Sequence, residues 1–202
     1  YNCRFTGWQD TIFNGDPMTC NMKKLMLPDF FQASEVPIVH KFYRNYFKDC
    51  YVCGDVDYIF GPNTAFFDHC EIHSIARVSE GKAYITAAST PAGQEFGLVF
   101  SHCRITGEEP DSVYLGRPWR DCAKTAFICC ELGDHICPEG WQNWGKVRAE
   151  VLSDYIEYGN FGPGADCSGR SPLSRCLVNP EVETYFSKEN VLVGEDGWIP
   201  AE

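Results

Sequence analysis

The sequence predicts an all-β solenoid, a stack of coils that each contribute short parallel strands. The main observation is a strand-like unit with an apolar start, a cysteine and an aliphatic end, which recurs with its cysteines 20, 33 and 27 residues apart. Such periods are typical of solenoids, in which every coil buries its apolar side against its neighbours. The 18 glycines and 12 prolines are spread between the units, as turns between short strands require.

The units follow one another in a regular order. They read YNCRF at 1–5, YFKDCYV at 46–52, AFFDHCEI at 65–72, LVFSHCRI at 98–105 and TAFICCEL at 125–132. Because side chains alternate along a strand, the cysteine of each unit and the residue two positions later should point inward. The chain opens inside a strand, with Cys3 and Phe5 and no earlier unit for them to stack on, so N-terminal coils are expected to be missing.

A helical pattern is scarce. The best candidate is MKKLMLPDFF at 22–31, which Pro28 interrupts, since proline removes a backbone donor and clashes with the preceding turn. This segment is therefore expected to be a short helix or a loop.

Composition places the chain among globular proteins of one domain. Of its 202 residues, 44% are hydrophobic and 14% aromatic, and no shift in composition marks a second domain. No apolar run reaches the length of a membrane-spanning helix, so no membrane partner is expected. The net charge of −11 repels phosphates, which argues against nucleic acid, and it also disfavours a fully charged polyuronate.

Ten of the twelve cysteines form two groups. Those of the repeated units precede apolar residues and are interpreted as buried free thiols that behave as small hydrophobic side chains; they are Cys3, Cys50, Cys70, Cys103 and Cys130. A second group lies in turn-like sequence and could form disulfides of undetermined connectivity; it comprises Cys20, Cys122, Cys137, Cys167 and Cys176.

Three short polar clusters carry the candidate chemistry: WQDT at 8–11, GDVDYIFG at 54–61 and LGRPW at 115–119. Two carboxylates held close together, Asp10 and Asp57, would have their pKa values split, so one could act as an acid while the other attacks. Arg117 offers a planar fork that could hold a carboxylate in its charged form, and Gln9 offers an amide donor to an oxyanion. Each residue alone is also compatible with a turn, a cap or a surface ion pair.

These clusters resemble motifs of the pectin methylesterase (pectinesterase) family. GDVDYIFG is similar to the family's G-x-V-D-[FY]-I-F-G, WQDT to its G-x-Q-D-T, and LGRPW to its L-G-R-P-W. The similarity continues through PEGWQNWG at 138–145, YIEYGNFGPGA at 155–165 and VLVGEDGWIP at 191–200. The resemblance implies a right-handed parallel β-helix, which agrees with the solenoid that the repeated units predict.

The resemblance also implies roles for single residues. Asp57 matches the family's nucleophile, Asp10 its general acid/base, Gln9 a donor of the oxyanion hole and Arg117 the partner of the nucleophile. A second set of positions is expected to contact the sugar chain: Trp119, Phe60, Tyr84, Trp141 and Val56. For Trp141 and its neighbour Trp144, groove and core were equally compatible with the sequence, and the resemblance favours the groove for Trp141.

The chain departs from the family pattern in two places. The family's early segment supplies a second oxyanion-hole glutamine from a Q-A-V-A-like stretch, which this sequence lacks. The interval between Asp10 and Asp57 is longer than usual, so the stretch at about 16–43 is expected to be an inserted loop. The whole of 1–202 is otherwise expected to form one β-helix domain that corresponds to the C-terminal two-thirds of the family's catalytic domain.

The function that this resemblance implies is hydrolysis of methyl esters of galacturonate units in pectin, giving pectate and methanol. The expected partner is methyl-esterified homogalacturonan, a nearly neutral polymer that a chain of negative charge would tolerate. No metal or organic cofactor is implied, and an extracellular or cell-envelope location follows from the substrate. The oligomeric state stays open.

Two alternatives share the same fold. A pectate lyase-like enzyme would need clustered carboxylates for calcium and a basic residue to remove a proton. A carbohydrate-binding β-helix without catalysis is the other. His69, Glu71 and His73 alternate in sequence and would share one strand face, which suggests a metal site, but outward polar residues on a solvated face need no metal.

Overall fold

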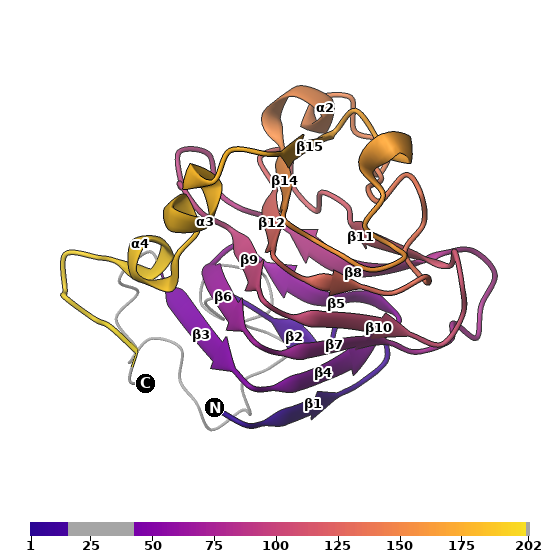
Figure 1. The fold of residues 1–202 in the computed structure, drawn as a ribbon, viewed down its shortest axis with the longest axis horizontal. Helices are drawn as coiled ribbons and strands as arrows, with labels where there is room; N and C mark the ends of the chain where they lie inside the picture. Colours follow the sequence, from indigo (N-terminus) through magenta and orange to yellow (C-terminus); the bar gives the residue numbers. More distant parts are fainter. Residues whose placement is uncertain (16–42, 201–202) are drawn as a thin grey trace, which may run out of the picture.

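The computed structural model describes residues 1–15 and 43–200. Its strands form three parallel sheets that wind into a β-helix (Figure 1). One wall is built from β1 (Arg4–Thr6), β4 (Tyr51–Gly54), β7 (Glu71–Ser74), β10 (Arg104–Gly107) and β13 (Glu131–Leu132). The second contains β2 (Ile12–Phe13), β5 (Val56–Gly61), β8 (Ala83–Ala88) and β11 (Val113–Gly116). The third contains β3 (Arg44–Lys48), β6 (Thr64–Asp68), β9 (Leu98–Ser101), β12 (Lys124–Ile128), β14 (Asp154–Tyr158) and β15 (Ser174–Leu177).

The predicted solenoid is confirmed by this arrangement. Each of the first four described coils places one strand in every wall, and every pairing between the described strands is parallel. Equivalent positions of neighbouring coils therefore lie above one another. The predicted inserted loop at 16–43 and the candidate helix at 22–31 lie outside the described residues, except for Tyr43.

Aromatic side chains stack along the axis of the β-helix. Phe47, Phe67, Phe100 and Phe127 form a column whose ring centroids are 4.5 to 4.6 Å apart and whose planes differ by 10° or less. Parallel pairing in register brings these rings into contact, since each is the in-pointing residue of its coil. Offset or parallel aromatic contacts add to the burial of apolar area that stabilises the coils.

The cysteines of four repeated units form a second internal column. Cys50, Cys70, Cys103 and Cys130 are at most 3% exposed. Each thiol donates a hydrogen bond to the carbonyl two residues earlier, as Cys130 Sγ does to the Ile128 oxygen. The residue two positions after each cysteine is also buried, so the predicted inward orientation is confirmed for these units.

Each repeated unit contains a corner, which sequence analysis placed inside a single strand. The residue before the cysteine adopts left-handed backbone, with φ between 49° and 54°; these residues are Asn2, Asp49, His69, His102 and Cys129. In the four later units the strand of the third wall ends before this residue, and the strand of the first wall begins after it. The prediction that His69, Glu71 and His73 share a strand is therefore wrong for His69, which lies at a corner, while the other two lie on β7.

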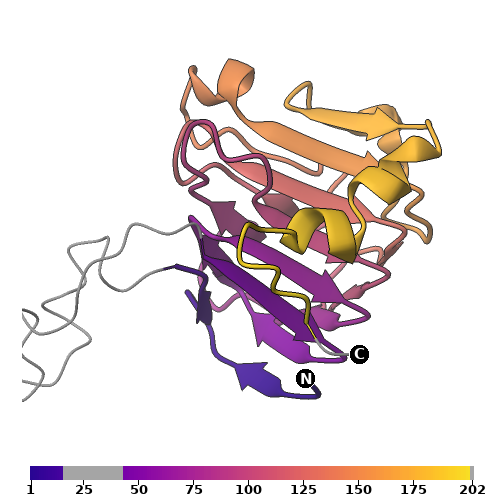
Figure 2. The same ribbon diagram turned by 90° about the vertical axis from the view of Figure 1, so that its left-hand side faces the viewer.

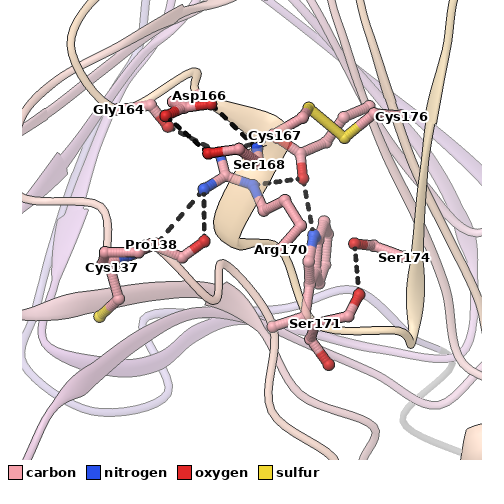
Figure 3. The surroundings of a disulfide bond; sticks show 12 residues. Cys137, Pro138, Gly164, Asp166, Cys167, Ser168, Arg170, Ser171, Ser174 and Cys176 are labelled. Atoms are coloured by element: carbon pink, nitrogen blue, oxygen red, sulfur yellow. Dashed lines mark hydrogen bonds and ion pairs between the residues drawn. A yellow bond between two sulfur atoms is a disulfide. The ribbon is translucent and has the colours of Figure 1, made fainter.

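Two cysteine predictions are corrected or refined by the structure. Cys3 is exposed and not buried, because the adjoining strand β1 lies at the edge of its sheet and, among the described strands, pairs with β4 alone. Of the cysteines that could pair, Cys167 and Cys176 form a disulfide (Figure 3). Cys122 and Cys137 are free thiols, and Cys20 lies outside the described residues.

Short helices cover the outer face of the third wall. Figure 2 shows α3 (Glu181–Tyr185) and α4 (Lys188–Leu192), in yellow, lying across it. Val182, Val191 and Leu192 pack there against outward-facing strand residues such as Phe66 and Val99. The remaining short helices of the described chain are α2 (Ala149–Leu152) and the 3₁₀ turn η1 (Cys167–Gly169). In the parts of the chain that are described, no helix has the length and apolar character needed to cross a membrane.

A buried ion pair continues the phenylalanine column into the last coils. Glu157 lies in register with Phe127 and is 2% exposed. Its carboxylate accepts from Arg170 Nε and Nη2 at 2.9 and 3.0 Å and from Trp141 Nε1 at 2.9 Å. Arg170 also donates to backbone carbonyls beside the disulfide, including that of Gly164 (Figure 3). Such complete pairing offsets the cost of removing both charges from water.

Candidate active site

Asp57 lies near the start of β5, on the wall of four strands. The register between β5 and β8 shifts between Val56 and Ile59, and Asp57 has left-handed backbone with φ of 51°. A bulge of this kind turns a side chain away from the regular alternation of a strand. The side chain is 7% exposed, so its carboxylate is largely shielded from solvent.

Arg117, just after β11, holds Asp57 in a two-pronged ion pair. Its Nε donates to Asp57 Oδ1 at 2.9 Å and its Nη2 to Oδ2 at 2.8 Å. The guanidinium carbon lies 3.8 Å from the ring centroids of both Tyr84 and Trp144. Two aromatic faces and one carboxylate thus fix the cation in a single orientation.

Asp10 follows β1 in a turn and approaches the same ion pair. Its backbone N–H donates to the Val56 oxygen at 3.1 Å, which ties the turn to the start of β5. Burial and the negative charge of Asp57 raise the pKa of Asp10 above its ordinary value, although Arg117 acts to lower it. The structure therefore brings Asp10, Asp57 and Arg117 together, as sequence analysis expected.

Gln9 is exposed beside Asp10 in this turn. The turn connects walls one and two of the first described coil, whereas Asp57 and Arg117 belong to later coils. Because coils stack in register, residues far apart in the sequence reach one place on the surface. The turn that contains Gln9 thus lies beside the start of β5, which carries Asp57.

Aromatic side chains extend the site along β5. Phe60, near the end of this strand, makes an edge-to-face contact with Trp119, with ring centroids 5.7 Å apart. Both rings are partly exposed. Partly exposed aromatic faces are suited to stacking against the apolar faces of sugar rings, so these two positions fit the predicted sugar contacts.

Two predicted sugar-contacting residues are corrected by their burial. Trp141 is 2% exposed, stacks on Tyr155 with ring centroids 4.2 Å apart, and uses its Nε1–H on Glu157. Trp141 is therefore a core residue, and its ring also contacts that of Phe127 edge to face inside the β-helix. Val56 is 7% exposed, and its contribution to the site is the carbonyl that accepts from Asp10.

The roles of Trp144 and Lys146 were not predicted from the sequence. Trp144 has left-handed backbone, with φ of 55°, and packs against the Arg117 guanidinium. Lys146 Nζ donates to the carbonyls of Pro118 and Trp119 at 2.7 and 2.9 Å. The sequence signal for this turn is the W-G-K string, in which a glycine permits a tight turn. The groups that Trp144 and Lys146 contact belong to the preceding coil, so they could be identified only from the stacked structure.

Fold and geometry together define a parallel β-helix with a two-carboxylate site on one wall. The model of the protein family described as Pectinesterase matches residues 32–195 of the chain. The chain belongs to the pectinesterase family.

Individual relatives agree with this assignment. The chain is 37% identical to pectinesterase 31 of Arabidopsis thaliana over 183 residues, which are 90% of this chain and 48% of that protein. It is 35% identical to probable pectinesterase A of Aspergillus fumigatus, over 86% of this chain and 46% of the relative. The chain thus spans about half the length of the curated relatives that it matches.

Solved structures show the same fold. A pectin methylesterase from carrot superimposes with a TM-score of 0.76 at 25% identity, over 95% of this chain and 55% of that one. A pectin methylesterase from Aspergillus niger in deglycosylated form gives a TM-score of 0.66 at 28% identity, over 94% and 52% of the two chains.

Proposed function

We propose that the protein hydrolyses methyl esters of galacturonate units in pectin and releases methanol. The observation that carries this proposal is the pair formed by Asp57 and Arg117 with Asp10 beside it. Both oxygens of one carboxylate accept from the Arg117 guanidinium, and the other carboxyl group has a raised pKa. Two carboxyl groups with different environments can divide the roles of nucleophile and acid.

The reaction begins when Asp57 attacks the ester carbonyl carbon. The bond from carbonyl carbon to methoxy oxygen breaks, and Asp10 gives its proton to the departing methanol. The raised pKa of Asp10 increases the fraction that holds this proton. The Gln9 amide is assigned to donate to the oxyanion that forms on the carbonyl oxygen.

Water then completes the turnover. It attacks the acyl-enzyme carbonyl while Asp10 takes up its proton, and the free galacturonate leaves as the Asp57 carboxylate is restored. Arg117 stabilises that carboxylate as it departs. Tyr84 and Trp144 act here by holding the guanidinium, and Phe60 and Trp119 by contacting the sugar chain.

Relatives support a pectin chain as substrate. A pectin methylesterase solved in complex with a hexasaccharide has a TM-score of 0.67 at 25% identity to this chain. The partly exposed aromatic rings along β5 are suited to such a chain. A pectate lyase-like role is less compatible with the site, because both oxygens of Asp57 are engaged by Arg117 and a calcium ion would have to displace that cation.

Methanol release from esterified pectin tests the proposal. Asp57→Asn should lower the rate by roughly 10³-fold or more, since the amide cannot act as the nucleophile. Asp111→Asn is the matched control, because that carboxylate pairs with Lys82 at the surface. A folded Asp57→Asn protein that releases methanol at the wild-type rate would remove Asp57 from the mechanism. A lyase would yield unsaturated, ultraviolet-absorbing products, and a binding protein would yield neither.

A further inference from the structure

One corner of the β-helix brings metal-binding side chains together. This corner connects the third wall to the first, and its positions in successive coils are Asp49, His69, His102, Cys129 and Gly159, all with positive φ. Because the register is kept through the corner, His102 and Cys129 are neighbours in the stack although 27 residues separate them. Asp57 lies on the second wall, so the corner is distinct from the candidate active site.

Helix α3 adds a carboxylate to this corner. The helix lies across the outer face of the third wall (Figure 2) and carries Glu183. Glu183 Oε1 lies 3.9 Å from His102 Nε2, and the donor atoms of His102, Cys129 and Glu183 all lie within 4.8 Å of one another. An imidazole nitrogen, a thiol sulfur and a carboxylate oxygen from three parts of the chain therefore converge.

The spacing of these donors is close to that of a tetrahedral metal site. Zinc bonds of about 2.0 to 2.3 Å place neighbouring ligand atoms roughly 3.3 to 3.7 Å apart. The side chains of His102 and Glu183 are 43% and 53% exposed, so solvent leaves them room to move. A rotation of either side chain would bring its donor atom the short distance that is needed.

Neighbouring residues fix the orientation of the His102 ring. Its Nδ1 lies 2.9 Å from Ser101 Oγ, and the ring stacks on that of His69, with centroids 5.2 Å apart and planes that differ by 7°. In the tautomer in which Nδ1–H donates to Ser101, Nε2 carries the lone pair on the side of Glu183. Metal-binding histidines usually donate their second ring N–H in this way.

The Cys129 thiol differs from the buried thiols of the internal column. It is partly exposed, and the next position of the corner is Gly159, where a Cβ atom would lie only 3.0 Å from Cys129 Sγ. Burial and the negative charge of Glu183 raise the pKa of this thiol. A bound dication reverses that effect, because it attracts both the carboxylate and the thiolate.

We propose that His102, Cys129 and Glu183 bind one Zn²⁺ ion, which links α3 to the corner of the β-helix. These three ligand types are the ones that zinc uses in proteins, and three of them leave a fourth position for water. Ca²⁺ and Mg²⁺ prefer sites made of oxygen atoms alone. When the ion binds, a Zn–S bond forms, the Cys129 S–H bond breaks, and its proton goes to solvent without any change of oxidation state.

Calorimetric titration with Zn²⁺ tests this site, using protein freed of metal by a chelator and kept anaerobic. We expect binding that Cys129→Ser and His102→Gln each weaken by more than about 100-fold, since loss of an outer partner of a metal ligand already costs about 10- to 100-fold. Glu183→Gln, on the exposed side of the site, should weaken it without disturbing the fold. Ser101→Ala should cost about tenfold, as an outer partner of His102.

Co²⁺ provides a spectroscopic test of the sulfur ligand. A thiolate bound to Co²⁺ produces charge-transfer absorption in the near ultraviolet, which we expect in the wild type and not in Cys129→Ser. Cys122→Ser is the matched control, because it removes a free thiol outside the site and should keep the absorption. Absorption of equal strength in the wild type and in Cys129→Ser would overturn the proposal.

A second control replaces a histidine with a similar partner on another wall. His73 Nε2 lies 3.8 Å from Glu108 Oε1, so His73→Gln removes a histidine–glutamate pair of nearly the same spacing and should leave the zinc affinity unchanged. Mg²⁺ in large excess should not displace Zn²⁺. A zinc affinity that is equal in the wild type and in His102→Gln, or that falls equally in His73→Gln, would contradict the assigned ligands.

Hydrogen exchange tests the link to α3. Zinc that binds only the folded protein stabilises it by mass action, so Zn²⁺ should slow amide exchange in α3 in the wild type and not in Glu183→Gln. Unchanged exchange in α3 at saturating Zn²⁺ would show that the ion does not hold the helix. The site is independent of the proposed esterase activity, and every readout here is binding or exchange, so a failure to release methanol would leave these results unaffected.

Discussion

At the scale of single residues, the site depends on a few side chains held in unusual backbone conformations. Asp10, Asp57 and Trp144 all have positive φ, which is uncommon outside glycine and is found for Asp more often than for Trp. Such residues persist where the surroundings fix them, and they concentrate at functional sites. Here the fixed groups are those that surround Arg117.

Replacement of Arg117 by lysine should reduce turnover by about 10²-fold or more. A single ammonium cannot make the two parallel contacts to Asp57 and cannot fill the space between Tyr84 and Trp144. Initial rates of methanol release, with circular dichroism to check the fold, provide the measurement. Arg104→Lys, on an exposed wall, is the matched control. Near-normal turnover in Arg117→Lys would show that charge alone, without the fork, supports Asp57.

His135 should make stability fall in mild acid. It is 1% exposed, its ring nitrogens have no hydrogen-bond partner, and burial lowers its pKa from 6.5 to about 4. Nearby His73 also lowers the pKa, while Asp134 acts to raise it. Below about pH 6.5 this histidine binds a proton in the unfolded chain, whereas in the folded protein it stays neutral until the pH falls to about 4. Stability is therefore lost across this window as pH falls.

The size of this effect is about 2 kcal/mol between pH 7 and about pH 5. His135→Phe removes the titrating group and should reduce the loss by that amount, whatever its stability at neutral pH. Urea unfolding of both proteins at the two pH values measures the difference. If both lose the same stability on acidification, His135 is not the group responsible.

At the scale of elements, the repeated units explain both what could be predicted and what could not. The in-pointing positions of Cys70 and Cys103 follow from sequence period, because one stacked coil resembles the next. The corner at Cys129 could not be predicted, since cysteine does not favour left-handed backbone, whereas His69 belongs to a residue type that is enriched there and its signal was overlooked. Helices α3 and α4 were missed because each has only five residues, too few to show a helical period.

The same reasoning applies to the site. Asp10, Asp57 and Arg117 were identified through motifs, and the coils bring them together. Burial of Trp141 could not be derived from its motif, because the ring packs on Tyr155 and donates to Glu157, which lie on the next wall, 14 and 16 residues later in the chain. Lys146 was missed for a related reason, since its partners are backbone carbonyls of the preceding coil.

The buried thiols should be inert in the native protein. Cys70 and Cys103 are each 1% exposed, so reagents cannot reach either sulfur. Burial also raises the pKa of the Cys103 thiol well above its ordinary value, which suppresses the reactive thiolate. A hydrogen bond with Cys103 lowers the pKa of Cys70, so the inertness of Cys70 depends on burial alone. Labelling followed by mass spectrometry should modify exposed Cys3 first and Cys122 next, and the two buried thiols only in denaturant. Rapid native labelling of Cys70 or Cys103 would contradict the internal column.

At the scale of the whole molecule, stacking makes stability local. In the part of the chain that the structure describes, each strand pairs only with strands of neighbouring coils, so a change at one end should spread gradually through the strands. Among the described residues β15 pairs with β14 alone, and near it the chain has both a disulfide and the buried pair of Glu157 and Arg170. These links stabilise the last described coil.

Removal of this disulfide should therefore loosen the last coils selectively. Cys167 and Cys176 are separated by nine positions, and closing such a loop stabilises a folded chain by about 2 to 3 kcal/mol. In Cys167→Ser/Cys176→Ser, amide hydrogen exchange should accelerate in β15 and next in β14, while amides of β6 and β9 keep their wild-type protection. Cys122→Ser, which removes a free thiol, should leave the exchange pattern unchanged. Equal acceleration in every coil would show that the β-helix opens as one cooperative unit and that the disulfide stabilises the whole of it.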